Sequence, residues 1–271
     1  MKLQLLYSRV RKAIDDYNMI DENDTIAVGI SGGKDSLALL YALSGLRRFY
    51  THKFNLIAIM INLGYDGFET KKIKDLCNQL NVPLYIVETE ISKILAINNN
   101  GISDENISCS LCAKLRKGAL NSKAKELNCT KVAYAHHQDD VVETTLMSQI
   151  FEGHYYCFPP VTYLSNCDIS VIRPLIYVTE AEIKGFKNKY DLPVEKNRCP
   201  KDGHSKREYV KELLNQINKD NPGAKKKMFS ALCSSTVEGW QKDNGSWYTF
   251  CCMLKFNRTN FQDNDIQSAR R

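Results

Sequence analysis

Short apolar segments rich in β-branched residues alternate along this chain with longer segments of helical periodicity. Buried strands are predicted at residues 25–30, 55–61, 84–87, 131–135 and 171–172. Helices are predicted at residues 1–18, 37–43, 69–80, 110–127, 139–151, 179–190 and 207–218. Strands that alternate with helices pair in parallel through right-handed crossovers, and continuous apolar strands suit a sheet covered on both faces. The sequence therefore predicts an α/β fold with a doubly wound, mostly parallel sheet, whose ligand lies at the carboxyl ends of the strands.

The composition is that of a globular protein and excludes a disordered or fibrous one, since 43% of the 271 residues are hydrophobic and 25% are charged. The net charge of +6 permits an anionic partner without establishing one. No apolar run approaches the roughly 18–20 residues of a membrane span, and the charged N-terminal segment is unlike a signal peptide. We therefore expect a cytoplasmic protein whose 10 cysteines serve as thiols, metal ligands or catalytic groups instead of forming disulfides.

A glycine-rich turn separates the first predicted strand from the following helix, with the sequence Ser31-Gly32-Gly33-Lys34-Asp35-Ser36. Paired glycines let the backbone turn tightly and aim N–H groups at an anion, and the helix N-terminus adds its dipole. The Walker pattern requires glycine at position 28 and serine or threonine at position 35, where this chain has Val28 and Asp35. The turn therefore predicts a phosphate-binding loop of another class, against the alternative of an ordinary glycine turn beside a solvated lysine.

Two cysteines, Cys109 and Cys112, are separated by about one helical turn, so both sulfurs face the same side. A helix N-terminus and nearby basic residues lower the pKa of a thiol and favour the thiolate. Together with the distant Cys199, these thiolates have the chemistry to bind an iron–sulfur cluster or zinc. The alternative is that they are unligated core residues, which is the interpretation we favour for Cys77 and Cys129.

Polar residues follow the strand predicted at residues 131–135. His136, Asp139 and Asp140 come at its carboxyl end, and therefore at the same edge of the sheet as the phosphate loop. Carboxylates there can hold Mg²⁺ together with phosphate oxygens, but aspartate also caps helices and complements their dipole. We expect Asp139 to be the cap and Asp140 the site residue, whereas Asp35 suits either role.

Several of these motifs, taken in order, resemble a known family. Ser-Gly-Gly-Lys-Asp-Ser after an apolar strand is the signature of the PP-loop, or N-type, ATP pyrophosphatases. The Cys-x-x-Cys block at 109–118, the His-His-x-Asp-Asp block at 136–140, the Arg-Pro-Leu block at 172–177 and residues 221–231 resemble the tRNA 2-thiocytidine synthetases (TtcA) of that superfamily. The resemblance implies an adenine nucleotide alpha hydrolase-like fold. It also implies an enzyme that cleaves ATP to AMP and pyrophosphate, adenylates the C2 oxygen of a tRNA cytidine at position 32, and then replaces AMP with sulfur.

The resemblance also implies a set of site residues. The catalytic residues would be Lys34, Asp35 and Asp140, and ATP would be bound by Ser31, Gly32, Gly33, Lys34, Asp35, Ser36 and His136. A [4Fe–4S] cluster with one open iron would be ligated by Cys109, Cys112 and Cys199, and Mg²⁺ by Asp140. Persulfide chemistry on the same cysteines is the alternative to the cluster. Expected partners are tRNA, a sulfur donor such as a cysteine desulfurase, and a second copy of the chain in a homodimer. The basic residues expected to bind RNA, against the alternative of a solvated charged face, are Arg116, Lys117, Lys201, Lys206 and Arg207.

The expected domains are an N-terminal helix over residues 1–20, a PP-loop ATP pyrophosphatase domain over 21–195, a basic helical segment with the third cysteine over 196–232, and a tail over 233–271. The tail departs from the family and receives no functional assignment. Two alternatives remain open. One is a sister PP-loop reaction, either 2-thiolation of a uridine or lysidine-type chemistry, although lysidine synthetases usually lack the Cys-x-x-Cys. The other is a non-enzymatic nucleotide- or metal-binding module, which would leave the intact phosphate loop without a use.

Overall fold

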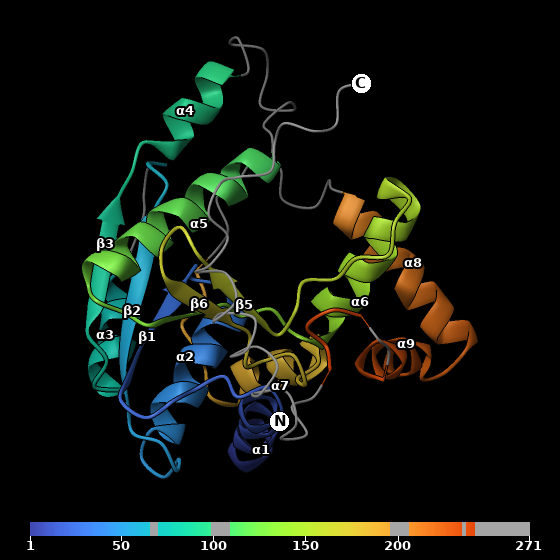
Figure 1. Ribbon diagram of the computed structural model, residues 1–271, viewed down its shortest axis with the longest axis horizontal. Coiled ribbons are helices and arrows are strands. Elements are labelled where there is room, and N and C mark those ends of the chain that lie inside the picture. Colours follow the sequence, from blue (N-terminus) through green and yellow to red (C-terminus); the bar gives the residue numbers. More distant parts are fainter. Residues whose placement is uncertain (66–69, 99–108, 196–205, 235–236, 242–271) are drawn as a thin grey trace, which may run out of the picture. The chain divides into compact units, whose positions relative to one another are not determined.

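The computed structural model describes residues 1–65, 70–98, 109–195, 206–234 and 237–241. Residues from Met1 to Gln241 form one compact unit. The N-terminal helix and the helices after residue 206 belong to this unit together with the sheet (Figure 1). Within the described residues, no helix combines the length and hydrophobicity needed to cross a bilayer.

A mixed sheet of six described strands forms the centre of this unit, in the order β3-β2-β1-β4-β6-β5 (Figure 1). Its strands are β1 (Asp24–Ile30), β2 (Phe54–Asn62), β3 (Leu84–Glu88), β4 (Lys131–Ala133), β5 (Val161–Leu164) and β6 (Ile169–Ile172). All neighbours pair in parallel except β5 and β6, which are antiparallel. The predicted doubly wound, mostly parallel sheet is confirmed. The edge strand β5 was not predicted, because a short edge strand needs no continuous apolar run and its Tyr163 is largely exposed.

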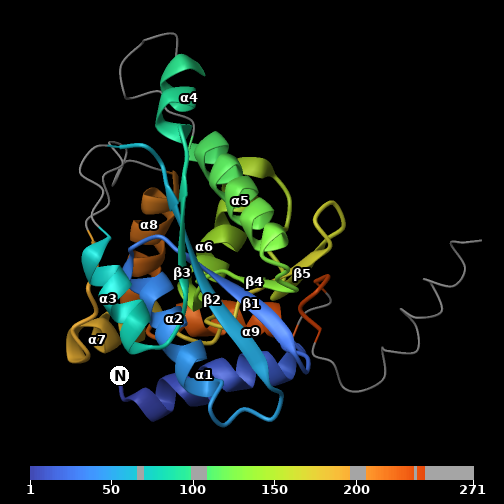
Figure 2. The same cartoon turned by 90° about the vertical axis from the view of Figure 1, so that its left-hand side faces the viewer.

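Helices cover both faces of the sheet, as Figure 2 shows. On one face lie α1 (Leu3–Asp16), α2 (Lys34–Leu46), α3 (Lys71–Gln79) and α7 (Glu180–Lys189), whose apolar sides share one core with the strands. On the other face, α5 (Cys109–Glu126) packs through Leu120 onto a second cluster that contains Ala27 and Val132. The short helix α4 (Ile91–Asn98) was not predicted. It packs against α5 through Ile91 and Leu95, which lie one turn apart.

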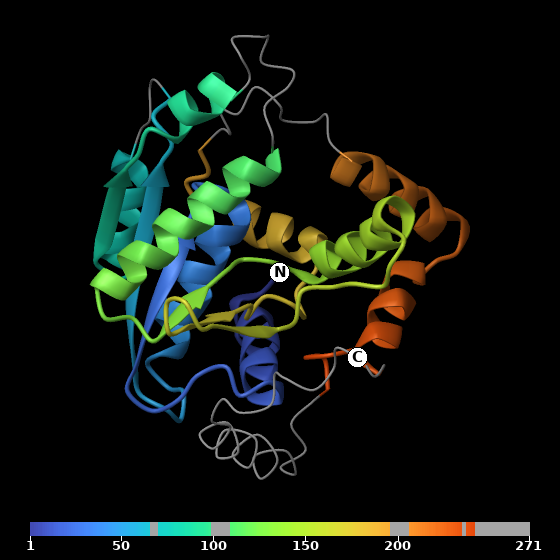
Figure 3. The same cartoon turned by 45° about the horizontal axis from the view of Figure 1, so that its top comes forward.

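Beside the sheet lies a group of helices from two parts of the chain, one directly after β4 and the other after α7. Figures 1 and 3 show these helices side by side. The group contains α6 (Gln138–Met147), the π-helical turn η2 (Ser148–Glu152), α8 (Lys206–Asp220) and α9 (Ala224–Cys233). The single helix predicted at residues 139–151 is therefore an α-helix that widens into a π turn at Ser148. The Ser148 hydroxyl donates to Thr145 O at 2.8 Å and accepts from the Tyr156 N–H at 3.0 Å. A side chain inserted in this way is a common cause of such local changes in a helix.

The buried core continues past residue 233, where the sequence indicated only an unassigned tail. Trp240 is fully buried, and its ring lies 6.2 Å from that of Tyr17 and 5.9 Å from that of Phe229. Residues 237–241 therefore belong to the same core as α1 and α9. The second tryptophan, Trp247, lies outside the described residues.

Candidate functional site

The glycine-rich loop connects β1 to α2 and is held in shape by its own two serines. The Ser36 hydroxyl donates to Gly33 O at 2.9 Å and accepts from the Ser31 N–H at 3.2 Å, while the Gly33 N–H donates to Ser31 Oγ at 3.3 Å. Gly32 has a φ of +79°, a left-handed conformation that glycine adopts without strain. No side chain caps the start of α2, so its first N–H groups are available to an anion.

A cavity of about 320 Å³ opens beside this loop, at the carboxyl ends of β1, β2 and β4. Its apolar wall comes from the sheet and from α5, and includes Ile59, Ile61 and Leu120. Its polar groups come from the loop, from α5 and from the turn after β4, and are Ser31, Asp35, Ser36, Arg116, Lys117, Tyr134 and His136. Apolar walls with a few convergent polar groups are typical of small-molecule sites. The structure thus brings together all the described residues expected to contact ATP except Gly32, Gly33 and Lys34, which form the adjoining loop.

Two residues that line this cavity carry a buried polar atom without a hydrogen bond among the described residues. They are Asp35, whose Oδ1 lies 3.9 Å from His137 Nε2, and His136, through its Nδ1. Burial, reinforced by the positive charges of Arg173 and Lys117, lowers the pKa of His136 to about 3, so its ring is neutral at physiological pH. Buried polar atoms in folded proteins almost always have partners. A ligand with hydrogen-bonding groups, such as a nucleotide, therefore fits this cavity.

Lys34 lies between two carboxylates at the mouth of the loop. Its ammonium is 3.0 Å from Asp35 Oδ2 and 3.3 Å from Glu180 Oε1. Burial alone would lower the pKa of Lys34, but these two carboxylates outweigh that effect and raise it. Lys34 is therefore fully charged at neutral pH, as a phosphate ligand must be.

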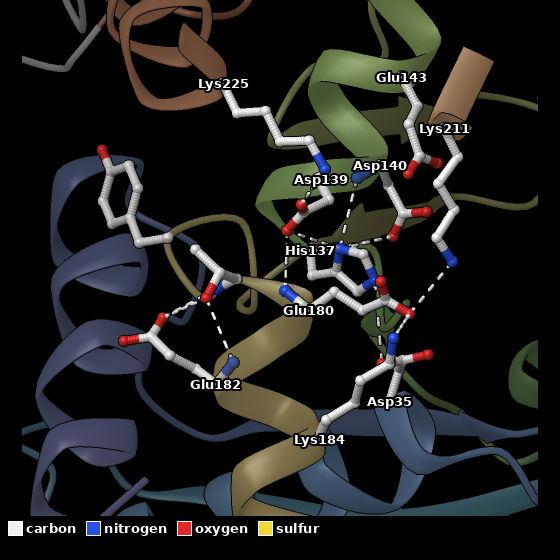
Figure 4. Close-up of polar contacts among 12 residues, drawn as sticks. Asp35, His137, Asp139, Asp140, Glu143, Glu180, Glu182, Lys184, Lys211 and Lys225 are labelled. Carbon is white, nitrogen blue, oxygen red and sulfur yellow. Dashed lines mark hydrogen bonds and ion pairs between the residues drawn. The ribbon is translucent and has the colours of Figure 1, made fainter. Parts of the chain in front are cut away.

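The helix caps differ from the prediction. The N-cap of α6 is His137, whose Nδ1 accepts from the Asp140 N–H at 3.3 Å, while Asp140 Oδ2 accepts from the His137 N–H at 2.9 Å. Asp139 instead accepts the Glu180 N–H at 2.8 Å and so caps α7 (Figure 4). The expectation that Asp139 caps its own helix is therefore wrong. Asp139 Oδ2 also lies 4.0 Å from Nδ1 of His137, but only Asp140 forms the capping box of α6.

The structure shows the surroundings of four of the five basic residues expected to contact RNA. Arg207 pairs with Asp140 Oδ1 at 2.9 Å and with Glu143 Oε2 at 3.4 Å. Lys206 lies 5.0 Å above the ring of Phe151. The wall of the cavity includes Arg116 and Lys117, whereas Lys201 lies outside the described residues. Their role toward RNA stays a prediction, and the structure adds a use that the sequence did not indicate, since Arg207 joins α8 to α6.

Two of the three cysteines expected to bind a cluster, Cys109 and Cys112, belong to α5. Cys109 is the first residue of α5, and Cys112 is partly buried against Ile91 and Leu95 of α4. The side chain of Cys109 and all of Cys199 lie outside the described residues. Within those residues, no group of three or more His, Cys, Asp and Glu side chains is arranged to hold a metal ion. The other cysteines of interest, Cys77 and Cys129, are buried, and burial raises the pKa of each thiol to about 11, as expected of core residues.

Sequence reasoning missed two functional candidates. Arg173 is buried, and its guanidinium lies 5.0 Å from the centre of the Phe158 ring, which itself lies 4.6 Å from the ring of His136. Glu180 pairs with three lysines from three helices. The only available signal for Glu180 was its position directly after Thr179, the N-cap of α7.

Comparisons with known proteins agree with this geometry. A family model described as a PP-loop domain matches residues 5–217. The chain is 38% identical over 233 residues to a protein of Pelobacter propionicus named tRNA-cytidine(32) 2-sulfurtransferase, covering 84% of this chain and 86% of that protein. It is 36% identical to the protein of the same name from Geobacter sulfurreducens, covering 86% of this chain and 90% of that protein. The chain belongs to this family of PP-loop tRNA sulfurtransferases.

A solved structure supports the same placement within the superfamily. The U34-tRNA thiolase NcsA from Methanococcus maripaludis, solved with its [4Fe–4S] cluster, resembles this chain with a TM-score of 0.65 and 27% sequence identity. The similarity covers 84% of this chain and 76% of that one. The sulfurtransferase family thus shares its PP-loop fold with a thiolase of another tRNA nucleotide.

The conformation of Gly32 gives a matched pair of variants. Gly32→Ala should lower the free energy of unfolding by about 1–2 kcal/mol, because an alanine is forced into a left-handed backbone conformation. Gly33→Ala should cost less, since Gly33 has an ordinary φ of −78° and a new Cβ would meet only Ser31 Oγ, at 3.3 Å. Urea unfolding of both variants measures the difference. Equal losses would contradict the assigned loop conformation.

Proposed function

We propose that this chain replaces the C2 oxygen of a tRNA cytidine, at position 32, with sulfur, and that it activates that oxygen with ATP. The observation that carries the proposal is the preorganised phosphate loop beside a cavity that Asp35 and His136 line, each with a buried polar atom that forms no hydrogen bond among the described residues. The names of the relatives supply the target nucleotide. The reaction has two displacements: the C2 oxygen attacks the α-phosphorus and pyrophosphate leaves, and then a sulfur nucleophile attacks C2 and AMP leaves with that oxygen.

The residues of the loop serve the first displacement. We propose that the N–H groups of the first turn of α2 bind the β- and γ-phosphates with the Ser31 hydroxyl as a further donor, while the Ser36 hydroxyl, which donates to Gly33 O, holds the loop in shape. Lys34 neutralises the charge that develops on the departing pyrophosphate, a preorganised electrostatic role. The adenine ring lies against the apolar wall of Ile59, Ile61 and Leu120, and the neutral His136 accepts or donates a hydrogen bond there.

Two carboxylates are candidates for Mg²⁺. Oδ1 of Asp35 forms no hydrogen bond among the described residues, and Oδ1 of Asp140 is the oxygen that does not take part in the capping box. Oxygen ligands of this kind suit Mg²⁺, which in nucleotide sites keeps several waters and phosphate oxygens. We propose that Asp140 binds Mg²⁺ through Oδ1, the atom that Arg207 contacts in this structure.

We propose that Cys109, Cys112 and Cys199 hold a [4Fe–4S] cluster, which would supply a soft site for sulfur. Support comes from the cluster of the U34-tRNA thiolase and from the position of Cys112 on α5, the helix whose next turns contribute Arg116 and Lys117 to the cavity. Cytoplasmic tRNA would bind over the basic residues named above. We also propose that a donor such as a cysteine desulfurase supplies the sulfur and that the chain forms a homodimer.

A uridine is the second candidate substrate, because the similar solved structure is a U34-tRNA thiolase. Nucleosides of tRNA from a strain lacking this gene, with and without the gene restored, separate the two by mass spectrometry. We expect 2-thiocytidine to disappear and to return on complementation. Loss of a 2-thiouridine with unchanged 2-thiocytidine would establish the second candidate and contradict the first.

Lys34 should be required for cleavage of ATP. Lys34→Ala should lower the rate of AMP formation in the presence of tRNA on the order of 100-fold or more, because charge on the leaving pyrophosphate loses its stabilisation. The matched control is Lys93→Ala, which removes an exposed lysine whose recorded ion pair is with Glu90 on the surface. Normal AMP formation by a folded Lys34→Ala variant would contradict the proposed role.

The cysteine assignment predicts which substitutions release iron. Cys109→Ala, Cys112→Ala and Cys199→Ala should each lose bound iron after anaerobic purification, because three thiolates are the proposed ligands. The controls Cys77→Ala and Cys129→Ala remove buried thiols of raised pKa and should retain it. Iron and visible absorbance are measured in all five variants. Full iron content in Cys199→Ala would show that another residue supplies the third ligand.

A further inference from the structure

Three lysines converge on one oxygen of Glu180. Its Oε1 lies 3.3 Å from the Lys34 ammonium, 3.2 Å from that of Lys184 and 3.3 Å from that of Lys211. Figure 4 shows Lys184 and Lys211 reaching Glu180 from different helices. Burial would raise the pKa of Glu180, but the hydrogen bond from Lys184 and the charges of Lys34 and Lys211 outweigh it and lower the pKa to about 2. Glu180 is therefore ionised under all physiological conditions.

The backbone of Glu180 is fixed by contacts that do not involve these lysines. Its N–H donates to Asp139 Oδ2 at 2.8 Å. The preceding residue, Thr179, forms a capping box with Glu182, which sets the first turn of α7. The same helix packs on α2 through the rings of Phe186 and Tyr41, whose centroids are 5.4 Å apart. Glu180 is thus a fixed acceptor at a helix N-terminus, where a negative charge is favourable.

Such an acceptor restricts the most mobile group of the phosphate loop. A lysine side chain carries about 2 kcal/mol of rotamer entropy, and an ammonium has three N–H donors. Asp35 is the next residue along the same helix, so its contact with Lys34 cannot by itself fix the ammonium relative to the sheet. Glu180 comes from α7 and holds Lys34 from the other side, which leaves one donor for a phosphate oxygen.

We infer that Glu180 is a positioning residue for Lys34, which it holds at the mouth of the loop before a nucleotide binds. The consequence for the reaction rests on the proposed function, whereas the restraint on Lys34 does not. The inference predicts opposite effects of the Glu180 charge on phosphate binding and on catalysis. Glu180 places a negative charge beside the phosphate site and therefore opposes binding of an anion, while it improves the placement of the group that stabilises the leaving pyrophosphate.

The test compares Glu180→Gln with Glu182→Gln, a neutralisation two residues further along the same helix. Glutamine at position 182 can maintain the capping box, and the carboxylate there pairs with Arg9 instead of Lys34. Three quantities are measured: acylation of Lys34 by an amine-reactive ester, followed by peptide mass spectrometry; the affinity for inorganic pyrophosphate by calorimetry; and AMP formation with ATP and tRNA.

In Glu180→Gln, Lys34 should be acylated several-fold faster than in the wild type, because loss of a carboxylate lowers its pKa and releases its side chain. Pyrophosphate should bind as tightly or more tightly, and AMP formation should fall by about 10- to 100-fold. Glu182→Gln should match the wild type in all three measurements. A purely structural role of Glu180 would instead weaken binding and catalysis together.

Unchanged acylation of Lys34 in folded Glu180→Gln would overturn the inference, as would weaker pyrophosphate binding in parallel with the slower rate. Should that variant not fold, Glu180→Asp retains the charge but is one methylene shorter. It should keep the pyrophosphate affinity and show faster acylation of Lys34 with slower AMP formation, and wild-type values for both would overturn the inference. If the wild type forms no AMP with tRNA, the proposed function fails, while the acylation and pyrophosphate measurements still decide the role of Glu180.

Discussion

The parallel pairing of β1 with β2 on one side and β4 on the other determines where every candidate functional group lies. Parallel strands end at the same edge of the sheet, so the phosphate loop after β1 and the His136–Asp140 turn after β4 become neighbours. The helix that follows β1, α2, and the helix that precedes β4, α5, cover opposite faces of the sheet, and the cavity opens between their ends. Asp35 and His136, each with a buried polar atom that forms no hydrogen bond among the described residues, line that cavity. The order of the strands therefore places the phosphate loop and the turn after β4 side by side.

Ion pairs then attach the later helices to this edge. Asp140 and Glu143 on α6 bind Arg207 of α8, Glu180 binds Lys211 of α8, and Asp139 binds Lys225 of α9. Burial raises the pKa of Glu143 to about 7, with Asp140 adding to the effect, so this network contains a carboxyl group close to its own titration point. Arg207, which the sequence predicted to contact RNA, thus also holds α8 against α6.

The sequence predicted those parts of the fold that follow from long or strongly apolar patterns. The central strands and the helices beside them were found because burial on both faces requires nearly continuous apolar residues. β5 and α4 were missed because an edge strand and an eight-residue helix require few buried positions. Trp240 was missed because the residues around it have no periodicity, although tertiary packing buries it completely.

Some residues of the candidate site could likewise be predicted from the sequence, and others could not. The phosphate loop and His136 were predicted to be neighbours because each directly follows a predicted parallel strand, and the carboxyl ends of such strands meet at one edge of the sheet. The prediction that Asp139 caps α6 was wrong, since one residue along a helix rotates the side chain by about 100° and only the packed structure shows what each aspartate contacts. Glu180 was beyond prediction, because its partners Lys34 and Lys211 are brought to it by the packing of α2, α7 and α8.

The central claim is that ATP activates the C2 oxygen of the base at this loop. It is tested most directly with tRNA transcribed from cytidine triphosphate that carries ¹⁸O at C2, followed by mass spectrometry of the AMP formed in one turnover. If the C2 oxygen attacks the α-phosphorus and departs with AMP, the AMP phosphate should contain one ¹⁸O atom. Unlabelled AMP, or cleavage of ATP to ADP, would contradict the account.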